Sequence, residues 1–552
     1  MQNSIFRRTL ALMATAALSL WPVAPAFAGQ DQGGTVHLTP VVSANHKTVG
    51  IAVPNVLSPE LIETIVAQGS NRLENPSELT SFYGYDNGGP FVPAPGDVQA
   101  PGHNVEATKT EPDKNTYLVL RNQQGTDPNY DYGTHFLFQG HELGQGGKGY
   151  VTRINLDADG AHRVTLMATS DVNGNPLPTI DGSTWYPFSH RLLFTSESGS
   201  NASVLQATLD VPSQVEDISG ILGRGGYEGI QADTWGRLII VEDVGGKNGT
   251  ANPHARQPNS FVYRFLPATP SDLKAGGKLQ VLQVMSKAHP GAIGFHAADI
   301  DGDITSQDQV DLHTYGLTFQ TNWVTVHDTA VNGFAPFGAN ALAKAAGGTP
   351  FKRPENGQFR PGSNFSEFIF DATGDTNALT EAANFGGLGA IFRLRLAGNG
   401  GTLSLVYRSD VAHSGFDNCG FWDADHIVFV EDAGDTLHTQ RSGLDSAFMF
   451  DLNADYSNPA NQPVRILAEG RDTSATLDSG LGAVQGSGFQ NEGDNEITGW
   501  HQSDGDPSVF GLLGAKIPTP FRNGWRLFFT QQHGDNFTWE ILPAVQNSEN
   551  QQ

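Results

Sequence analysis

Several short apolar runs in this sequence end in carboxylates, the side chains that bind hard metal ions or move protons. The clearest run, 238–243, reads LIIVED, and comparable runs occupy 192–197, 367–371, 427–432 and, less acidic, 527–535. One acidic loop after a strand is ordinary, because Asp and Gly are common in solvated turns. Recurrence after several strands favours convergence on one site, where bound cations would relieve the repulsion between the carboxylates.

The elements that must position these carboxylates are buried strands. Each run has the length and the β-branched or aromatic composition of such a strand. A second apolar run follows most of them, at 260–265, 390–394 and 447–451. Paired strands that repeat with uneven insertions predict a radial array. We therefore predict an all-β fold, a β-propeller with six blades and long loop insertions.

Residues 29–552 are predicted to form one propeller domain, with the largest insertion at about 267–350. Three alternating aspartates at 299–303 resemble a calcium loop, but an EF-hand would need Gly and Glu where Ile304 and Val310 stand. We expect short helices at 339–346 and within 57–74, where Ser58-Pro59-Glu60 is a start signal.

The composition excludes some classes of partner. The 552 residues carry a formal net charge of −26, and only 16% of them are charged. Nucleic acid is an unfavourable partner, because its phosphates need Lys and Arg. An acidic balance suits a secreted protein or one that collects divalent cations.

Residues 1–28 have the pattern of an export signal peptide. Arg7-Arg8 precede an apolar stretch at 10–20, and Ala26-Phe27-Ala28 offers a cleavage site. The paired arginines leave twin-arginine export open beside general secretion. We expect a periplasmic or secreted protein, and no other run is long and apolar enough to span a bilayer.

Cys419 is the only cysteine, so no internal disulfide can tie the long loops of an exported chain. Bound Ca²⁺ is the candidate that would replace it. We interpret Cys419 itself as a small buried residue rather than a nucleophile.

A set of motifs, in order along most of the mature chain, resembles the PhoX-type alkaline phosphatases. That family consists of secreted, calcium- and iron-dependent enzymes built on a propeller. Gly140-His141-Glu142 resembles the family's Asn-His-Glu motif, and Lys352-Arg353-Pro354-Glu355-Asn356 its Arg-Pro-Glu motif. The other matching segments are 193–197, 227–230 with 236–243, Asp417-Asn418, 496–499 and 531–534.

The resemblance implies a phosphoesterase that hydrolyses a small-molecule phosphate ester, and we expect a monomer. Hydrolysis of such an ester depends mainly on charge stabilisation, which metals and a planar guanidinium supply. Arg353 and Glu355 are the implied catalytic residues. The implied metal ligands are Glu142, Glu197, Glu228, Glu242, Glu355 and Glu431.

Each of these assignments has a structural alternative. Arg353 could pair with a nearby carboxylate, His141 could be a hydrogen-bonded loop histidine, and Asp417-Asn418 could form an Asx turn.

Two departures from the family pattern bear on the metals. Ser196 stands where the family has an iron-binding cysteine, and Gly140 stands where it has an asparagine. Calcium is therefore the expected cofactor, and iron stays open. Two other functions remain: a calcium-stabilised propeller without catalysis, acting as a binding or surface protein, and a calcium-dependent, lactonase-like hydrolase.

Overall fold

The computed structural model describes residues 37–47, 53–78, 80–85, 91–93, 104–106, 110–142, 149–198, 204–381, 383–470, 496–532 and 536–544. The chain divides into two units, Met1–His37 and Leu38–Gln552. The predicted export signal at 1–28 lies outside the described residues. The division into a signal and one domain stays a prediction.

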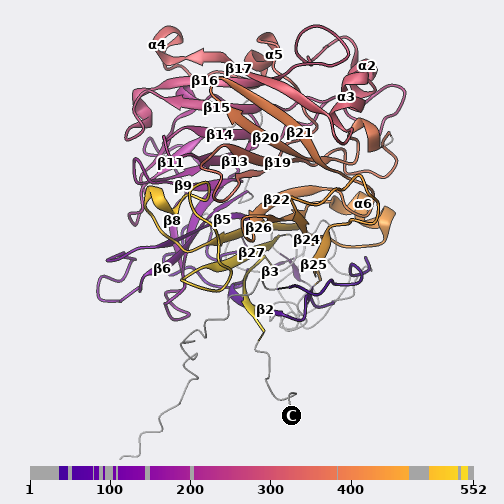
Figure 1. Ribbon diagram of the computed structural model, residues 1–552. Coiled ribbons are helices and arrows are strands. Elements are labelled where there is room, and N and C mark those ends of the chain that lie inside the picture. The colour runs from indigo at the N-terminus through magenta and orange to yellow at the C-terminus, as the bar shows by residue number, and fades with distance from the viewer. Residues whose placement is uncertain are drawn as a thin grey trace, which may run out of the picture. The chain divides into compact units, whose positions relative to one another are not determined.

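The second unit is mostly β structure in several antiparallel sheets (Figure 1). Within the described residues, six groups of four strands each form an antiparallel meander. The first three meanders are β5 (Pro112–Val119), β6 (His135–His141), β7 (Tyr150–Asn155) and β8 (Val164–Ala168); β9 (Ser183–Tyr186), β10 (Arg191–Phe194), β11 (Leu205–Ala207) and β12 (Val215–Asp217); and β13 (Tyr227–Ala232), β14 (Leu238–Glu242), β15 (Val262–Pro267) and β16 (Gly277–Val284).

The last meander is completed by a strand from the N-terminal part of the unit, which joins two distant parts of the chain. The remaining three meanders are β18 (Gly357–Phe359), β19 (Glu367–Ala372), β20 (Ala390–Ala397) and β21 (Gly400–Arg408); β22 (Phe416–Phe421), β23 (His426–Glu431), β24 (Ser446–Asp451) and β25 (Val464–Ala468); and β26 (Glu496–Ser503), β27 (Arg526–Gln532) and β28 (Phe537–Pro543) with β2 (Leu61–Ala67).

Other strands extend or link these sheets. β1 (Val56–Leu57) pairs with β25, and β17 (Thr318–Asp328) joins β16 to β21 in one nine-stranded sheet. β3 (Phe91–Pro93) and β4 (Asn104–Glu106) form a separate hairpin. The α-helices are α1 (Ser219–Leu222), α2 (Ile300–Ile304), α3 (Gln307–Leu312), α4 (Thr329–Asn332), α5 (Ala339–Ala345) and α6 (Gly434–Arg441), and the 3-10 helices are η2 (Leu273–Ala275), η3 (Ala383–Phe385) and η4 (Val509–Gly511). None of the helices in the described part of the chain is long and apolar enough to cross a membrane.

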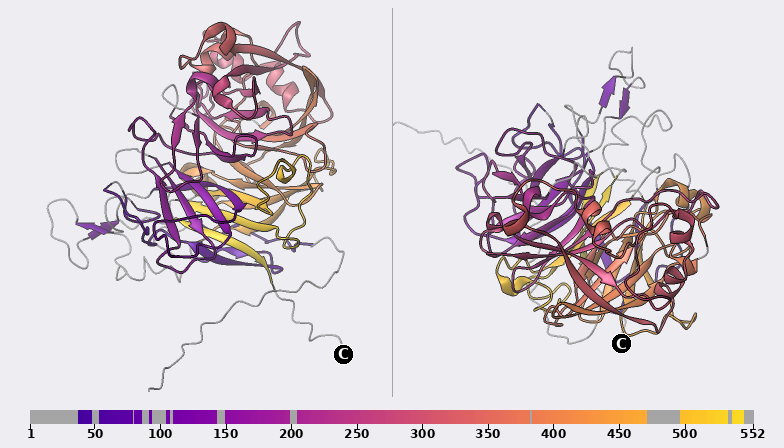
Figure 2. Two further views of the ribbon diagram at one scale, coloured as in Figure 1. Left: turned by 90° about the vertical axis from the view of Figure 1, so that its left-hand side faces the viewer. Right: turned by 90° about the horizontal axis from the view of Figure 1, so that it is seen from above.

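The first strands of the six meanders contact one another in a closed cycle. β5 contacts β9, and the contacts continue through β13, β18, β22 and β26 back to β5. Figure 2 shows strands from the C-terminal part of the chain, in yellow, beside strands from its N-terminal part, in purple. Each meander therefore turns its first strand toward a common centre.

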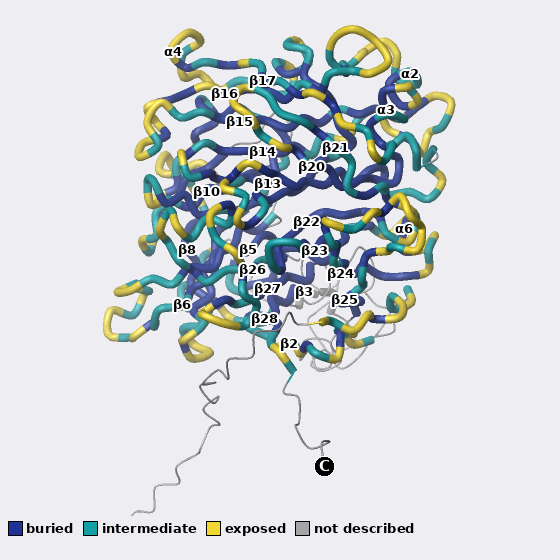
Figure 3. Tube along the Cα trace, in the orientation of Figure 1, coloured by how far each residue is buried: buried dark blue, intermediate teal, exposed yellow. Residues whose placement is uncertain are grey.

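The core lies between neighbouring meanders. Phe138 of β6 packs in one apolar cluster with Phe194 of β10, and Val262 of β15 shares another with Phe370 of β19. First and second strands are buried almost throughout, while the loops carry the exposed residues (Figure 3). Burial on both faces explains why these strands read as continuous apolar runs. The prediction of a mostly β fold from those runs is confirmed.

Of the two helices that the sequence predicts, the structure contains one. The helix expected within 57–74 is wrong: that stretch contains β2, which pairs with β28 in register Ile65 to Trp539. Its β-branched residues at 62 and 64–66 suit a strand, and pairing with a distant segment prevails over the local start signal. The helix expected at 339–346 is present as α5. The interval 267–350 holds α2 to α5, but β16 and β17 within it belong to the nine-stranded sheet.

Substitution of Trp539 tests how much the sheet of β2, β28, β27 and β26, here called the closing sheet, contributes to stability. Trp539 is 2% exposed, and its ring lies nearly parallel to that of Phe529. Because Trp539→Ala would leave a cavity in this packing, it should reduce the free energy of unfolding by about 3–5 kcal/mol. Ile62→Ala in the paired strand β2 is the control, because that side chain is 48% exposed and should change the value by less than about 1 kcal/mol. Urea unfolding measures both. Equal losses would contradict this account of the closing sheet.

Candidate metal centre

Bulges in the first strands place acidic side chains at the common centre. The pairing register shifts between Pro112 and Asn115 in β5, between Tyr227 and Ile230 in β13, and between Phe416 and Cys419 in β22. Each shift encloses an acid: Asp113, Glu228 and Asp417, respectively. A bulge interrupts the ladder and re-aims the side chain of the extra residue. Asp181 and Glu355 stand shortly before β9 and β18, so five first strands contribute one acid each.

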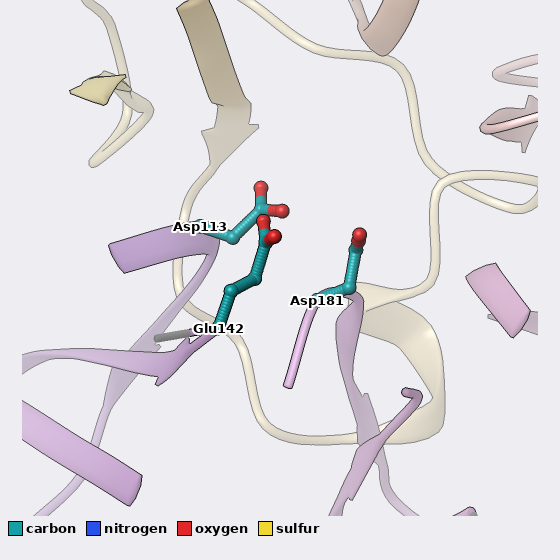
Figure 4. A group of neighbouring side chains, drawn as sticks. All are labelled: Asp113, Glu142 and Asp181. Carbon is teal, nitrogen blue, oxygen red and sulfur yellow. The ribbon is translucent and has the colours of Figure 1, made fainter. Parts of the chain in front are cut away.

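These acids join two from loops after second strands, Glu142 and Glu197, to form what we call the carboxylate cluster. The cluster consists of three groups with oxygens within 4.8 Å of one another: Asp113, Glu142 and Asp181; Asp181, Glu197 and Glu228; and Glu228, Glu355 and Asp417. Shared members link the groups into a chain of seven carboxylates. Figure 4 shows the first group, whose side chains point into the same space.

The cluster contains buried oxygens without partners. Asp181 Oδ1, Glu228 Oε2 and Glu355 Oε1 lack a hydrogen bond from any described residue, although each of these residues is at least 95% buried. Glu355 Oε1 does contact a guanidinium nitrogen of Arg353 as an ion pair. Buried charge without compensation costs several kcal/mol, so such atoms call for a ligand. Ca²⁺ takes about 6–8 oxygen ligands and fits an all-oxygen donor set.

Burial and mutual repulsion raise the pKa values across the cluster. Burial, together with the charge of Asp417, raises the pKa of Asp113 to about 7, and burial raises that of Asp417 to about 6. Burial also raises the pKa of Glu228 well above its ordinary value, and Asp181 and Glu355 add to the shift. The carboxylates therefore resist being ionised together unless cations are bound.

Arg353 lies at the edge of the carboxylate cluster. Its Nε donates to both oxygens of Asp243 at 3.1 and 2.9 Å, and its Nη2 lies 2.7 Å from Glu355 Oε1. Its backbone is left-handed, with φ of 56°, an unusual conformation for a residue with a side chain. Nη2 also lies 2.9 Å from Asp243 Oδ2, so two carboxylates hold the Nε–Nη2 edge of the guanidinium; no hydrogen bond or ion pair of Nη1 with a described residue is seen. The predicted pairing of Arg353 with a nearby carboxylate is thus present.

Two predicted metal ligands, Glu242 and Glu431, belong to none of the three groups. Glu242 accepts hydrogen bonds from the Tyr263 hydroxyl at 3.1 Å and the Asn340 amide at 2.9 Å, and burial raises its pKa to about 8. Glu431 forms a two-pronged ion pair with Arg441 at 2.9 and 3.1 Å. Both oxygens of Glu431 are thus paired, whereas the partners of Glu242 bind Oε2 and its buried Oε1 has no hydrogen bond from a described residue.

The position of an acid relative to its strand explains this division. Glu242 and Glu431 are the last residues of second strands, one strand away from the centre. The residues that follow them, Asp243 and Asp432, both raise the pKa of Arg353, against the effect of its burial. In each Glu-Asp pair, the second acid is thus the one near the cluster.

Sequence reasoning missed Asp113 and Asp181. It took its candidates from the ends of apolar runs and from the family motifs, and neither Asp113 nor Asp181 belongs to one of those segments. A signal was available for Asp181, because the pairs Asp181-Gly182, Glu228-Gly229, Glu355-Asn356 and Asp417-Asn418 each precede one of the apolar runs that end in acids. Asp113 is followed by Lys114 and has no such pair.

The residues that depart from the family motifs are fixed by packing. A Cβ at Gly140 would lie 2.0 Å from Ile180 Cγ2, so the site excludes a side chain. His141 is buried between the hydroxyls of Thr152 (2.8 Å) and Thr110 (3.2 Å), and burial lowers its pKa to about 3. It is hydrogen-bonded, as the alternative for this residue predicted, but it ends strand β6 and does not lie in a loop. Ser196 Oγ lies 3.2 Å from Ser198 Oγ.

Asp417 and Cys419 are both buried in β22. The side-chain amide of Asn418 donates to both oxygens of Asp417 at 2.9 Å and to the Thr498 hydroxyl at 2.8 Å. Cys419 lies in an apolar cluster with Phe416, and burial raises the pKa of its thiol. This environment suits the predicted small buried residue rather than a nucleophile.

Two cavities lie away from the carboxylate cluster. One, of about 210 Å³, is lined by Trp235, Arg237 and Arg264, and the other, of about 230 Å³, by His289, His296 and residues of α2 and α3.

Metal-free protein should lose stability as pH rises. The folded-state pKa values of Asp417 and Asp113 (about 6 and 7) lie above the unfolded value of about 4, so the folded state holds extra protons within that window. With chelator, the free energy of unfolding should fall from about pH 4 to about pH 7, and calcium should restore it at pH 8. Thermal unfolding in high salt, which screens the general surface charge, measures this. An unchanged or higher Tm at pH 8 with chelator would contradict it.

Glu228→Gln and Glu431→Gln should have opposite effects. The first should weaken calcium binding by more than about tenfold, since even outer-shell changes cost 10–100-fold, and it should stabilise the metal-free protein by removing a repelled charge. The second breaks a buried pair and should cost on the order of 3 kcal/mol without changing calcium affinity. Calorimetric calcium titration and urea unfolding separate the two roles. A loss of calcium affinity in Glu431→Gln would contradict this account and indicate that Glu431 is a calcium ligand.

Comparison with known proteins gives a likeness in structure only. No family model and no curated protein sequence matches the chain. Among solved structures it is similar to Pseudomonas fluorescens PhoX in complex with vanadate, a transition state analogue, with a TM-score of 0.51 and 10% identity over 92% of this chain and 97% of that chain. Weaker likenesses are to Chaetomium thermophilum Sqt1 (TM-score 0.33, 11% identity, 79% of this chain and 96% of that chain) and Acinetobacter baumannii TolB (0.28, 11%, 78% and 64%). These structures are β-propellers, and the chain resembles PhoX in fold.

Proposed function

We propose that this chain is an exported, calcium-dependent phosphoesterase of the PhoX type, with its site at the carboxylate cluster. The observation that carries the proposal is a chain of seven carboxylates, five buried and two half-buried, with the guanidinium of Arg353 beside it. The fold similarity to PhoX, solved with a transition state analogue, supports this reading of the site.

The fold assigned in this proposal is a six-bladed β-propeller, with each four-stranded meander as one blade. The closed cycle of contacts among the six first strands supports it. So does β2, which completes the last meander from the other end of the unit and so closes the ring. In a propeller, the first strands surround a central channel. The carboxylate cluster would then line that channel.

Calcium is the proposed metal because the available donors are all carboxylate oxygens. Glu228, Glu355 and Asp417 would hold it, because their oxygens form one of the three groups and Glu228 Oε2 has no partner among the described residues. Iron would lack a thiolate ligand, because Ser196 replaces the implied cysteine and Cys419 is enclosed in an apolar cluster. Bound cations would supply neutralisation of the negative charge on the transferring phosphoryl group.

Arg353 would orient the phosphate ester. Asp243 holds its Nε edge, so the guanidinium keeps a fixed direction, and Nη1 remains for a phosphate oxygen. A pre-positioned guanidinium loses little freedom when it binds an oxyanion. Glu355 would hold a cation and, through its 2.7 Å contact, keep Arg353 beside it.

A second candidate is a calcium-stabilised propeller without catalysis, acting as a binding or surface protein. Gly140 favours it, because packing against Ile180 excludes the polar side chain that the family motif carries there. A lactonase-like hydrolase stays a third outcome of a substrate screen. In every case we propose export to the periplasm or beyond, on the signal pattern at 1–28.

The decisive experiment pairs metal analysis with an assay. Protein purified without chelator should contain calcium and hydrolyse a generic phosphomonoester, and chelation should abolish turnover. Arg353→Gln should lower kcat/KM about 100-fold with calcium retained, because it removes one charge-stabilising donor. Arg395→Gln, at a side chain that is 60% exposed, is the matched control. Calcium without phosphomonoester hydrolysis would overturn the phosphoesterase, and a lactone screen would then separate the other two functions.

A further inference from the structure

The cavity of about 210 Å³ lies between the third and fourth meanders, away from the carboxylate cluster. Most of its lining comes from the turn between β13 and β14, the connection between β18 and β19, and the turn between β20 and β21. Glu228 and Glu355 stand at the opposite ends of β13 and β18. At about 3.3 Å per residue, β13 separates Asp233 in the lining from Glu228 by roughly 15 Å. The cavity is therefore distinct from the candidate metal centre.

One wall of the cavity is apolar. Ile239, Phe359 and Phe365 line it, and each is at most 3% exposed. Trp235 also lines it, is 52% exposed, and lies edge-on to Phe365 with 6.3 Å between the ring centroids. Asn364 and Phe365 are consecutive left-handed residues, with φ of 52° and 59°, a strained form that is concentrated at binding sites. Since an apolar cavity of about 150 Å³ can bind benzene, this one has room for a single ring with a small substituent.

The charged residues in the lining carry an excess of positive charge. Arg237 and Arg264 stand beside one acid, Asp233. Asp233 accepts a hydrogen bond from Arg237 Nε at 2.5 Å and others from the backbone N–H groups of Trp235 and Arg237. Arg264 is 6% exposed and donates to neutral acceptors, which are Gln280 Oε1, the Gly398 carbonyl and Asn399 Oδ1. A buried guanidinium that pairs with no carboxylate of the described residues is costly, so an anion in the cavity would stabilise it.

The guanidinium of Arg237 is held in position with part of it unused. It lies over the Trp235 ring, 4.4 Å from the centroid, and its Nε is paired with Asp233. Neither Nη1 nor Nη2 of Arg237 forms a hydrogen bond or ion pair with a residue in the described ranges. A guanidinium that is already oriented loses little freedom when it binds a planar oxyanion through two parallel N–H groups.

We propose that this cavity binds a small organic anion, a carboxylate carried on a single ring. The carboxylate would accept hydrogen bonds from the free nitrogens of Arg237, and its charge would compensate that of Arg264. The ring would lie against Phe359 and Phe365, so the site combines an apolar wall with a few polar groups, as ligand pockets commonly do. This activity needs neither the carboxylate cluster nor phosphoesterase turnover.

Benzoate is the probe, with benzamide as the neutral analogue and acetate as the anion without a ring. In calorimetric titrations of protein purified without chelator, benzoate should bind at least about tenfold more tightly than either. Arg237→Gln should weaken benzoate binding about tenfold or more, because it removes a charge-assisted hydrogen bond. Trp235→Ala should weaken it about fivefold, because an aromatic contact and the support of Arg237 are lost. Arg121→Gln, at an exposed arginine outside the lining, is the matched control and should leave the affinity unchanged.

The contradicting results are equally definite. Absence of saturable benzoate binding below about 10 mM, or equal binding of benzamide, would overturn the anion site, and equal binding of acetate would overturn the ring. Weaker benzoate binding in Arg353→Gln would place the probe at the carboxylate cluster and so overturn the proposal. If urea unfolding shows that Arg237→Gln does not fold, Trp235→Ala decides, and unchanged benzoate affinity in that variant would overturn the site. Benzoate binding by a chain that hydrolyses no phosphomonoester would support this site and count only against the proposed function.

Discussion

Mutual repulsion among buried carboxylates is the constraint on which the rest of this structure depends. Asp113, Glu228 and Asp417 are enclosed near other carboxylates. Burial raises the pKa values of all three, and neighbouring carboxylates add to the shifts of Asp113 and Glu228. A fold cannot hold such groups ionised without cations. The same constraint accounts for the unpartnered oxygens and for the cationic side chain of Arg353 next to the acids. All of these features follow from the need to compensate the negative charge of the carboxylates.

The sheets make this arrangement possible by bringing six distant segments to one centre. Packing between neighbouring meanders is apolar and buried, so the positions of the first strands are fixed by the core. Bulges at Asp113, Glu228 and Asp417 then direct acids away from the ladder. Apolar packing in the sheets stabilises the fold, and repulsion between the carboxylates at the centre destabilises it. Such a compromise is common where a binding site is built from polar groups.

The strands were predictable from their apolar composition. The site was only partly predictable, because which acids belong to it depends on the position and register of the strands. Runs such as 238–243 became second strands because they are buried on both faces. Glu142, Glu197, Glu228 and Glu355 were predicted from motifs and belong to the carboxylate cluster. Glu242 and Glu431 carried the same local signal, yet strand position gave them Tyr263, Asn340 and Arg441 as partners. A sequence does not say which of two adjacent acids faces the centre, since that depends on register. Likewise, β2 was mistaken for a helix because its partner β28 lies at the other end of the chain.

The central claim is that cations neutralise the carboxylate cluster. Anomalous diffraction from crystals grown with calcium, measured at long wavelength, tests it directly. The account predicts anomalous peaks within Ca²⁺–oxygen distance, about 2.3–2.6 Å, of Glu228, Glu355 and Asp417. Ordered density without an anomalous peak at these carboxylates, in crystals whose side chains are otherwise well defined, would contradict it.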